Sequence, residues 1–202
     1  MPVTPVPTPR GTAELHLDEG ELGWLALGHG AGGGVDAPDL LAARDGALAA
    51  GWGVVRVQQP WRVAGRRVAE PPPRLDEAWL AALAGLAGPL VVGGRSAGAR
   101  VACRTATELG AVAVLCLAFP LHPPGRPERS RLDELRLPAV PRLVVQGDRD
   151  AFGVPLPEPG IEVHLVAGAD HAMRTRKADG RSAAEVHDEI AAQTQRWLQT
   201  LT

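Results

Sequence analysis

One serine of this chain is flanked in a way that would make it a nucleophile. Ser96 lies in the pentapeptide Gly94-Arg95-Ser96-Ala97-Gly98, directly after the apolar run 89–93. Such a run, followed by glycines and a helix-permitting stretch, predicts a buried strand, a sharp turn and a helix. Glycines two residues to either side avoid clashes across the turn, and the helix N–H groups can stabilise an oxyanion. We therefore expect Ser96 to attack an electrophilic carbon.

A serine hydroxyl needs a general base, and its two candidate partners follow later apolar runs. Asp150 comes shortly after the run 143–145, and His171 follows the run 161–166. In a doubly wound sheet, ligands bind outside the carboxyl ends of the strands, so residues at these ends meet at one edge. We predict Ser96 as nucleophile, His171 as base and then acid, and Asp150 as the carboxylate that orients the imidazole.

Other acidic residues and other histidines compete for these roles. Asp148 is the alternative to Asp150, unless it braces the turn through backbone amides. Asp170 points elsewhere if His171 points inward, so a loop-bracing role is expected for it. The alternatives for the base are His29, His122 and His164, of which His164 falls in the middle of a predicted strand.

The glycine-rich segment 27–34 follows an early apolar run and predicts the second half of an oxyanion hole. In this interpretation the backbone N–H of Ala31 faces the N–H of Ala97. The segment also contains a G-x-G-x-x-G spacing, which is a weak signal for dinucleotide binding. That reading needs an acidic residue about 20 positions later, where this chain has Arg56 and Gln58 instead.

Four further residues are candidates for substrate binding, and three of them have a structural alternative. Trp61 would wall an acyl pocket or pack in the core, and Arg95 would line the entrance or form an ion pair. His122 would touch substrate at the pocket rim or lie exposed on a loop. His29, in the glycine-rich segment, completes the set. No cluster of His, Cys and Asp has metal-ligand spacing, so we expect no metal and no other cofactor.

The elements that would position these residues alternate along the chain. Seven runs are typical of strands: 13–17, 24–27, 53–57, 90–92, 112–117, 143–145 and 161–166. Helical spacing joins Leu75, Trp79, Leu83 and Leu86, then Ala102, Ala106 and Leu109, and finally Val186, Ile190, Trp197 and Leu201. Pro38 suits the first turn of an early helix, and Ser182 with Glu185 forms a capping box before the last one.

This alternation predicts an α/β fold with a doubly wound, mostly parallel sheet flanked by helices on both faces. We expect a single domain over 12–202, preceded by a loose, extended, proline-rich arm over 1–11. The irregular segments 59–74 and 121–141 lack the length and periodicity of a large cap domain. Whether 121–141 folds over the site is left open.

Composition excludes several classes of function. The chain has 202 residues, of which 45% are hydrophobic and 22% charged, and a net charge of −2, so neither nucleic acid nor an anionic membrane is an expected partner. The N-terminus lacks the features of a signal peptide, and no segment is long enough to span a membrane, so a cytoplasmic location is expected. Cys103 and Cys116 are expected to be buried free thiols rather than a disulfide. The oligomeric state is not indicated.

Five stretches carry a resemblance to a known family: HGAGGG (29–34), GGRSAGAR (93–100), FPLHPPGRPE (119–128), QGDRDAFG (146–153) and GADHAM (168–173). In this order they resemble the α/β-hydrolase superfamily, specifically its small cap-less group close to dienelactone-hydrolase-like predicted bacterial hydrolases. The order Ser, Asp, His is also that of the superfamily's triad. Dienelactone hydrolases proper use cysteine at the position of Ser96. Relatives often carry a larger residue at Ala97 and glycine at Ala99.

The resemblance implies a serine hydrolase that cleaves small carboxylic esters or thioesters through an acyl-enzyme. The missing cap implies an open, shallow site, and a serine nucleophile excludes the chemistry of relatives that attack with aspartate. Two alternatives remain: an acyltransferase with the same triad, and a non-catalytic binding module that keeps the fold.

Overall fold

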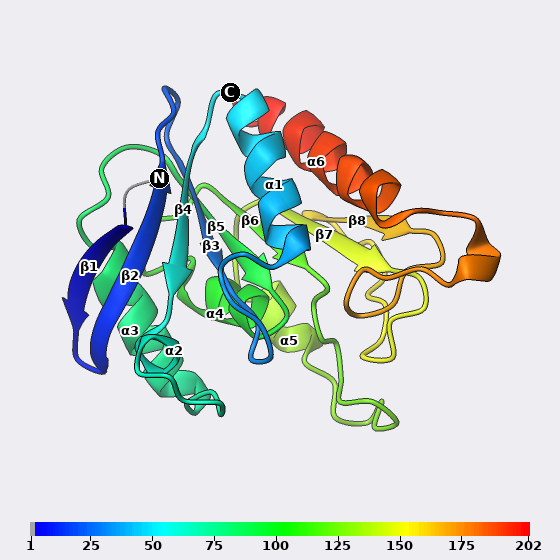
Figure 1. The fold of residues 1–202 in the computed structure, drawn as a ribbon, viewed down its shortest axis with the longest axis horizontal. Coiled ribbons are helices and arrows are strands. Elements are labelled where there is room, and N and C mark those ends of the chain that lie inside the picture. The colour runs from blue at the N-terminus through cyan, green and yellow to red at the C-terminus, as the bar shows by residue number, and fades with distance from the viewer. Residues whose placement is uncertain (1–2) are drawn as a thin grey trace.

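The computed structural model describes residues 3–202, and its strands form one eight-stranded sheet (Figure 1). The strands are β1 (Val3–Thr8), β2 (Gly11–Asp18), β3 (Trp24–Gly28), β4 (Gly53–Gln58), β5 (Leu90–Arg95), β6 (Ala113–Leu117), β7 (Arg142–Gly147) and β8 (Ile161–Val166). Their spatial order is β1-β2-β4-β3-β5-β6-β7-β8, parallel from β4 to β8 and antiparallel at β1 and β2. The predicted mostly parallel α/β sheet is confirmed.

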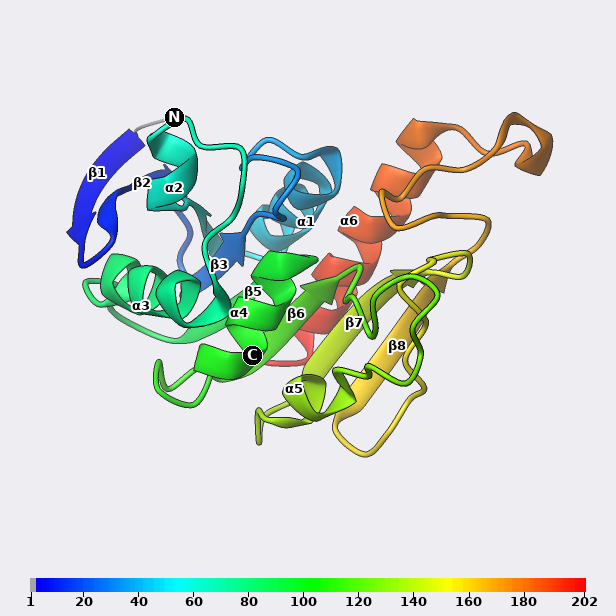
Figure 2. The same ribbon diagram turned by 90° about the horizontal axis from the view of Figure 1, so that it is seen from below.

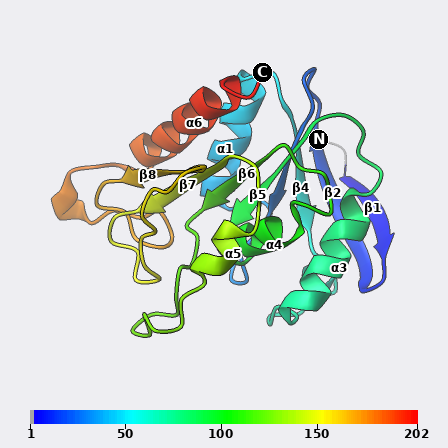
Figure 3. The same cartoon turned by 180° about the vertical axis from the view of Figure 1, so that it is seen from behind.

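Helices cover both faces of the sheet. They are α1 (Pro38–Ala49), α2 (Pro60–Val63), α3 (Pro72–Leu83), α4 (Ala97–Thr105), α5 (Leu132–Arg136) and α6 (Ala183–Gln199), with a short 3-10 turn η1 (Lys177–Asp179). Figures 1 and 2 show α1 and α6 on one face, and Figure 3 shows α3, α4 and α5 on the other. Both faces of the central strands are therefore buried, which explains why these strands are apolar at consecutive positions.

The expected loose arm at the N-terminus is wrong for the residues that the structure describes. Residues 3–8 form the edge strand β1, which pairs antiparallel with β2. Pro5 and Pro7 occupy alternate positions of this strand. Proline is tolerated on an edge strand because alternate N–H groups there have no partner to lose. The sheet therefore begins at residue 3, not at residue 12, and Met1 and Pro2 lie outside the described residues.

The first and last helices pack closely against each other. A Cβ atom on Gly46 of α1 would lie 2.2 Å from the carbonyl oxygen of Ala191 in α6, so only glycine fits this approach. Helix α1 begins at Pro38, as expected, and the predicted capping box of Ser182 and Glu185 starts α6. Because of this close approach, α6 holds α1 against the sheet.

Three helices end earlier than their apolar spacing predicts: Leu86, Leu109 and Leu201 lie beyond the ends of α3, α4 and α6. The two irregular segments contain only short helices, α2 together with the first turn of α3 in one and α5 in the other. No cap domain is inserted anywhere in 3–202. Among these residues, no helix has both the length and the apolar character needed to cross a bilayer.

Candidate active site

Ser96 occupies a strained turn between β5 and α4. Its backbone angles are φ 52° and ψ −109°, in a region that residues other than glycine rarely adopt. The Ser96 N–H donates a hydrogen bond of 2.9 Å to the carbonyl of Leu117, at the end of the neighbouring strand β6. The Ser96 carbonyl accepts one of 3.2 Å from the N–H of Arg100. The sheet and the helix thus hold both sides of the turn.

The two glycines of the pentapeptide allow this turn to approach strand β3. A Cβ atom on Gly98 would lie 2.2 Å from the carbonyl oxygen of Gly28, and one on Gly94 would lie 2.4 Å from the same oxygen. The expected clash across the turn is also present, since that Cβ of Gly94 would lie 2.8 Å from the carbonyl carbon of Gly98. The nearest obstacle, however, is Gly28 of β3, whose part in this contact was not foreseen from the sequence.

His171 lies between Ser96 and Asp150. Its Nε2 atom is 3.0 Å from the hydroxyl oxygen of Ser96, and its Nδ1 atom is 2.8 Å from Oδ2 of Asp150. The Asp150 side chain is fully buried, and the ring of Phe152 stacks on the imidazole with centroids 4.1 Å apart. With Asp150 ionised, Nδ1 is the donor to the carboxylate, so Nε2 is free to accept the serine proton.

Further contacts fix the carboxylate of Asp150. Its Oδ1 atom accepts a hydrogen bond of 2.8 Å from the N–H of Phe152, and its Oδ2 accepts one of 2.8 Å from the Gln146 side chain. The Gln146 amide also donates to the carbonyls of Phe119 and Gly153. Gln146 was not among the residues predicted from the sequence. The available signal was its polar side chain, which interrupts the apolar run of the buried strand β7 four residues before Asp150.

The competing acidic residues brace loops. Oδ1 of Asp148 accepts a hydrogen bond of 2.8 Å from the N–H of Gly168. Oδ1 of Asp170 accepts hydrogen bonds from the N–H groups of Ala172 (2.8 Å) and Arg174 (3.0 Å). Of the three candidate carboxylates, only that of Asp150 hydrogen-bonds the imidazole of His171.

Arg95 links the loop that carries His171 to helix α1. Its Nη2 donates a hydrogen bond of 2.9 Å to the carbonyl of His171, and its Nε lies 2.6 Å from Oδ2 of Asp39. Asp39, in the first turn of α1, is 3% exposed, and this burial raises the pKa of its carboxyl, although Arg95 opposes the shift. Arg95 was a candidate for substrate binding, but its guanidinium lies between these two partners instead.

His29 holds the glycine-rich loop. Its Nε2 accepts a hydrogen bond of 3.2 Å from the N–H of Gln59, so Nδ1 carries the proton and donates to the carbonyl of Gly30 over 2.9 Å. Burial lowers the pKa of His29, since the protein surroundings disfavour the charged ring. A neutral His29 thereby ties the loop after β3 to the end of β4.

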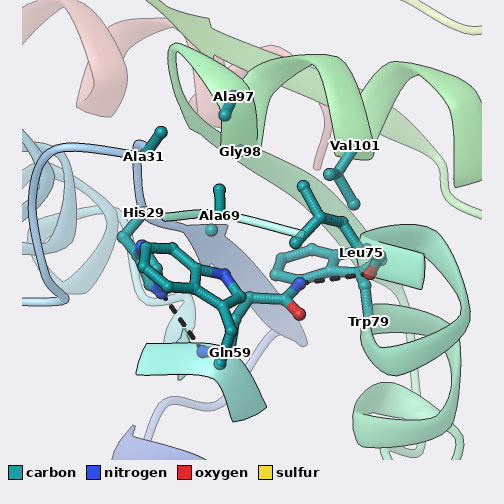
Figure 4. A pocket seen from close by; sticks show the side chains of 11 residues that line it. His29, Ala31, Gln59, Ala69, Leu75, Trp79, Ala97, Gly98 and Val101 are labelled. Atoms are coloured by element: carbon teal, nitrogen blue, oxygen red, sulfur yellow. Dashed lines mark hydrogen bonds between the residues drawn. The ribbon is translucent and has the colours of Figure 1, made fainter. Parts of the chain in front are cut away.

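A narrow, mainly apolar pocket opens beside the serine turn (Figure 4). Its cavity volume is about 10 Å³, which is room for roughly one water molecule. Its lining residues are Gly28, His29, Ala31, Gln59, Trp61, Ala69, Leu75, Trp79, Ala97, Gly98 and Val101. Figure 4 shows Ala31 and Ala97 at one end and Gln59 at the other. The N–H groups of Ala31 and Ala97 donate to no acceptor within 3–202.

Two of the four candidate substrate-binding residues, His29 and Trp61, line this pocket. His122 does not: its N–H bonds the carbonyl of Phe152, and its Nδ1 lies 3.0 Å from the carbonyl of Pro123. His164 joins β8 to α6 through Glu189 and lies away from the serine. In the described part of the chain, no three His, Cys, Asp or Glu side chains are grouped as a metal site.

Comparisons with known proteins agree with this architecture. The sequence model of the family described as "Alpha/beta hydrolase domain" matches residues 23–199. XC6422 from Xanthomonas campestris, described as an a/b serine hydrolase without lid, superposes with a TM-score of 0.72 at 19% identity, over 97% of this chain and 94% of that chain. No curated protein matches the sequence significantly.

Two further solved structures show the same fold. Est1E from Butyrivibrio proteoclasticus has a TM-score of 0.72 at 13% identity, and 98% of each chain is covered. Alpha/beta hydrolase domain-containing protein 10 from mouse has a TM-score of 0.70 at 11% identity, and 100% of each chain is covered. At these identities the superpositions establish the fold alone, so the reaction has to be argued from the geometry of the site.

Proposed function

This chain belongs to the alpha/beta hydrolase domain family, and we propose that it is a serine hydrolase that cleaves small carboxylic esters or thioesters. One observation carries the proposal. The continuous hydrogen-bonded chain from Ser96 Oγ through His171 to Asp150 has lengths of 3.0 Å and 2.8 Å. A nucleophile, a base and an orienting carboxylate at such distances form the geometry of acyl transfer.

In the proposed reaction Ser96 Oγ attacks the acyl carbon while Nε2 of His171 accepts the hydroxyl proton. The charge on the former carbonyl oxygen develops between the N–H groups of Ala31 and Ala97, and each such donor contributes about 10²–10³-fold to the rate. His171, now positively charged beside the ionised Asp150, gives its proton to the departing alcohol or thiol. Water then attacks the acyl-enzyme with His171 as base, and the acid leaves.

The pocket supports an assignment of the two halves of the substrate. Ala31 and Ala97 line the pocket, whereas no residue of the loop that carries His171 does so. The leaving group takes its proton from His171, so it has to lie on that side of the serine. The acyl group is therefore assigned to the other side of the serine, on which Ala31 and Ala97 lie.

Labelling with a fluorophosphonate probe tests the proposal most directly, because the probe reacts only with an activated serine. Mass-spectrometric mapping should find the adduct on Ser96 and none on Ser130, which lies exposed on a loop. Ser96→Ala should abolish labelling, whereas Ser130→Ala should leave it unchanged. Absence of labelling in the folded wild-type protein would contradict the proposal and favour a binding module.

A further inference from the structure

The ring of Phe152 covers one face of the His171 imidazole. The two rings are stacked, with 4.1 Å between their centroids and 30° between their planes. The two hydrogen-bond contacts of the imidazole, to Asp150 and to Ser96, use nitrogen atoms whose protons and lone pairs lie in the plane of the ring. Phe152 therefore contacts the imidazole where neither of these two partners does, and the proposed triad alone does not explain its position.

Four backbone hydrogen bonds hold the segment that carries this ring. The Phe152 N–H donates to Oδ1 of Asp150 over 2.8 Å, and the Phe152 carbonyl accepts from the N–H of His122 over 2.9 Å. The Gly153 N–H donates to the Asp150 carbonyl over 3.0 Å, and the Gly153 carbonyl accepts from the Gln146 side chain over 2.9 Å. Since 152 and 153 use only backbone atoms here, a replacement of the Phe152 side chain leaves all four donors and acceptors in place.

The proposed reaction puts a positive charge against the aromatic face. When Nε2 of His171 takes the proton of Ser96, the neutral imidazole becomes an imidazolium whose charge is spread over its ring. The face of a benzene ring is the negative part of its quadrupole and attracts a cation within about 6 Å of its centroid. The stack of 4.1 Å meets this condition. The attraction is stronger for the imidazolium than for the neutral ring, so it favours the transition state over the resting enzyme.

Exclusion of water by Phe152 would have the opposite effect if it acted alone. Removing water from a histidine disfavours its charged form, so an aliphatic side chain in this position would oppose the proton transfer. The His171 side chain is only 21% exposed, so the imidazolium is shielded from water over most of its surface. An aromatic face replaces part of the attraction that water would supply, and an aliphatic side chain does not.

We propose that Phe152 is a positioning residue for His171, whose aromatic face stabilises the imidazolium that forms during the reaction. This inference rests on the proposed function, because the imidazolium forms only if Ser96 gives its proton to His171. The attack of Ser96 and the later attack of water both pass through this cation. Loss of the aromatic face should therefore lower kcat and kcat/KM together.

Graded fluorination of Phe152 tests the inference. Ring fluorines withdraw electron density from the aromatic face and hardly change the shape of the side chain, so they separate the charge of the face from its packing. Phenylalanines with one, two and three ring fluorines are introduced at position 152 by amber suppression. The readouts are the rate of fluorophosphonate labelling of Ser96 and kcat for hydrolysis of p-nitrophenyl acetate. Both should fall stepwise along the series, by about three- to tenfold in total.

Ordinary variants frame this series. Phe152→Leu keeps an apolar side chain without an aromatic face, so its kcat should fall at least as far as that of the trifluorinated protein. Phe152→Tyr retains the face and should stay within about threefold of wild type. Leu156→Ala is the matched control, because Leu156 lies in the same loop and is 75% exposed, and its kcat should equal that of wild type. Circular dichroism verifies folding, and the fluorinated series decides alone if Phe152→Leu does not fold.

The outcomes separate the two proposals. Equal rates along the fluorinated series would overturn the role of the aromatic face, even if Phe152→Leu is slow, and would leave Phe152 as a packing residue. Labelling of Ser96 in the wild-type protein would in that case still support the serine hydrolase. Absence of labelling and of hydrolysis in the folded wild-type protein would overturn the proposed function itself.

Discussion

The side chain of Arg95 hydrogen-bonds the backbone carbonyl of His171 over 2.9 Å, although the two residues lie 76 positions apart in the chain. The residue before the proposed nucleophile thus holds the loop that presents the proposed base. Asp39 completes the contact from helix α1, with 2.6 Å between its carboxylate and Arg95. The distance between Ser96 and His171 therefore depends on a side-chain contact as well as on the sheet.

Arg95→Met should lower both stability and kcat. It leaves the buried Asp39 carboxylate unpaired, and breaking a buried ion pair in this way costs about 3–5 kcal/mol of unfolding free energy, measured by urea denaturation. Combining it with Asp39→Asn removes the unpaired charge and should restore part of that stability. The kcat of the double variant should stay low, because the His171 carbonyl still lacks its donor. Recovery of kcat together with stability would refute a positioning role.

The two neighbouring aspartates should respond very differently to the same change. Asp150→Asn presents an amide to Nδ1 of His171 and favours the wrong imidazole tautomer, so kcat should fall by about 10⁴-fold. Asp148→Asn retains an oxygen that can accept from the Gly168 N–H, so kcat should stay within about threefold of wild type. The measurement is kcat for each variant with one and the same ester. A larger loss of kcat in Asp148→Asn than in Asp150→Asn would assign the role of the orienting carboxylate to Asp148.

The free energy of unfolding should decrease as the pH is lowered, and His29 should cause part of this decrease. Burial holds the folded pKa of His29 below its ordinary value of 6.5, so below pH 6.5 the unfolded chain takes up a proton that the folded protein excludes. Folding is then penalised by up to about 1.4 kcal/mol per pH unit from this residue. Urea titrations between pH 5 and 7.5 should show a shallower pH dependence for His29→Gln. Equal slopes would mean that His29 does not stay neutral.

Gly98→Ala tests the close approach of α4 to β3. The added methyl group meets the backbone oxygen of Gly28, which cannot rotate away, so helix and strand have to separate. Overpacking of this kind costs about 1–3 kcal/mol, and the displaced Ser96 should also lose activity. Gly85→Ala is the control, since no atom lies within 4 Å of a Cβ placed there. The melting temperature of this control and its rate of ester hydrolysis should match those of the wild-type protein.

The sequence allowed the central sheet and the proposed triad to be predicted for a common reason. Central strands buried on both faces are apolar at most positions, so their ends are visible in the sequence, and the residues of the proposed triad follow the ends of β5, β7 and β8. Strand β1 was missed because its alternate prolines are typical of an extended arm, and only the pairing with β2 shows that they suit an edge.

The supporting contacts could not be predicted, since each joins residues that are distant in the sequence. The partners of Arg95 come from α1 and from the loop after β8. The pocket likewise takes Gln59 from the end of β4 and Val101 from α4. Burial of Cys103 and Cys116 was predicted correctly, and both thiols are free, but their sulfur atoms lie 3.5 Å apart, a proximity that no spacing revealed.

The contact between Gly46 and Ala191 has a consequence for the order of events during translation. Helix α6 is synthesised after all the other described helices and strands, yet it packs against helix α1, which carries Asp39 at its start. While residues 183–199 are still inside the ribosome, that side of α1 has nothing to pack against, and Arg95 lacks a firmly held anchor. A nascent chain therefore contains Ser96, Asp150 and His171 before α6 has fixed the contact between Asp39 and Arg95.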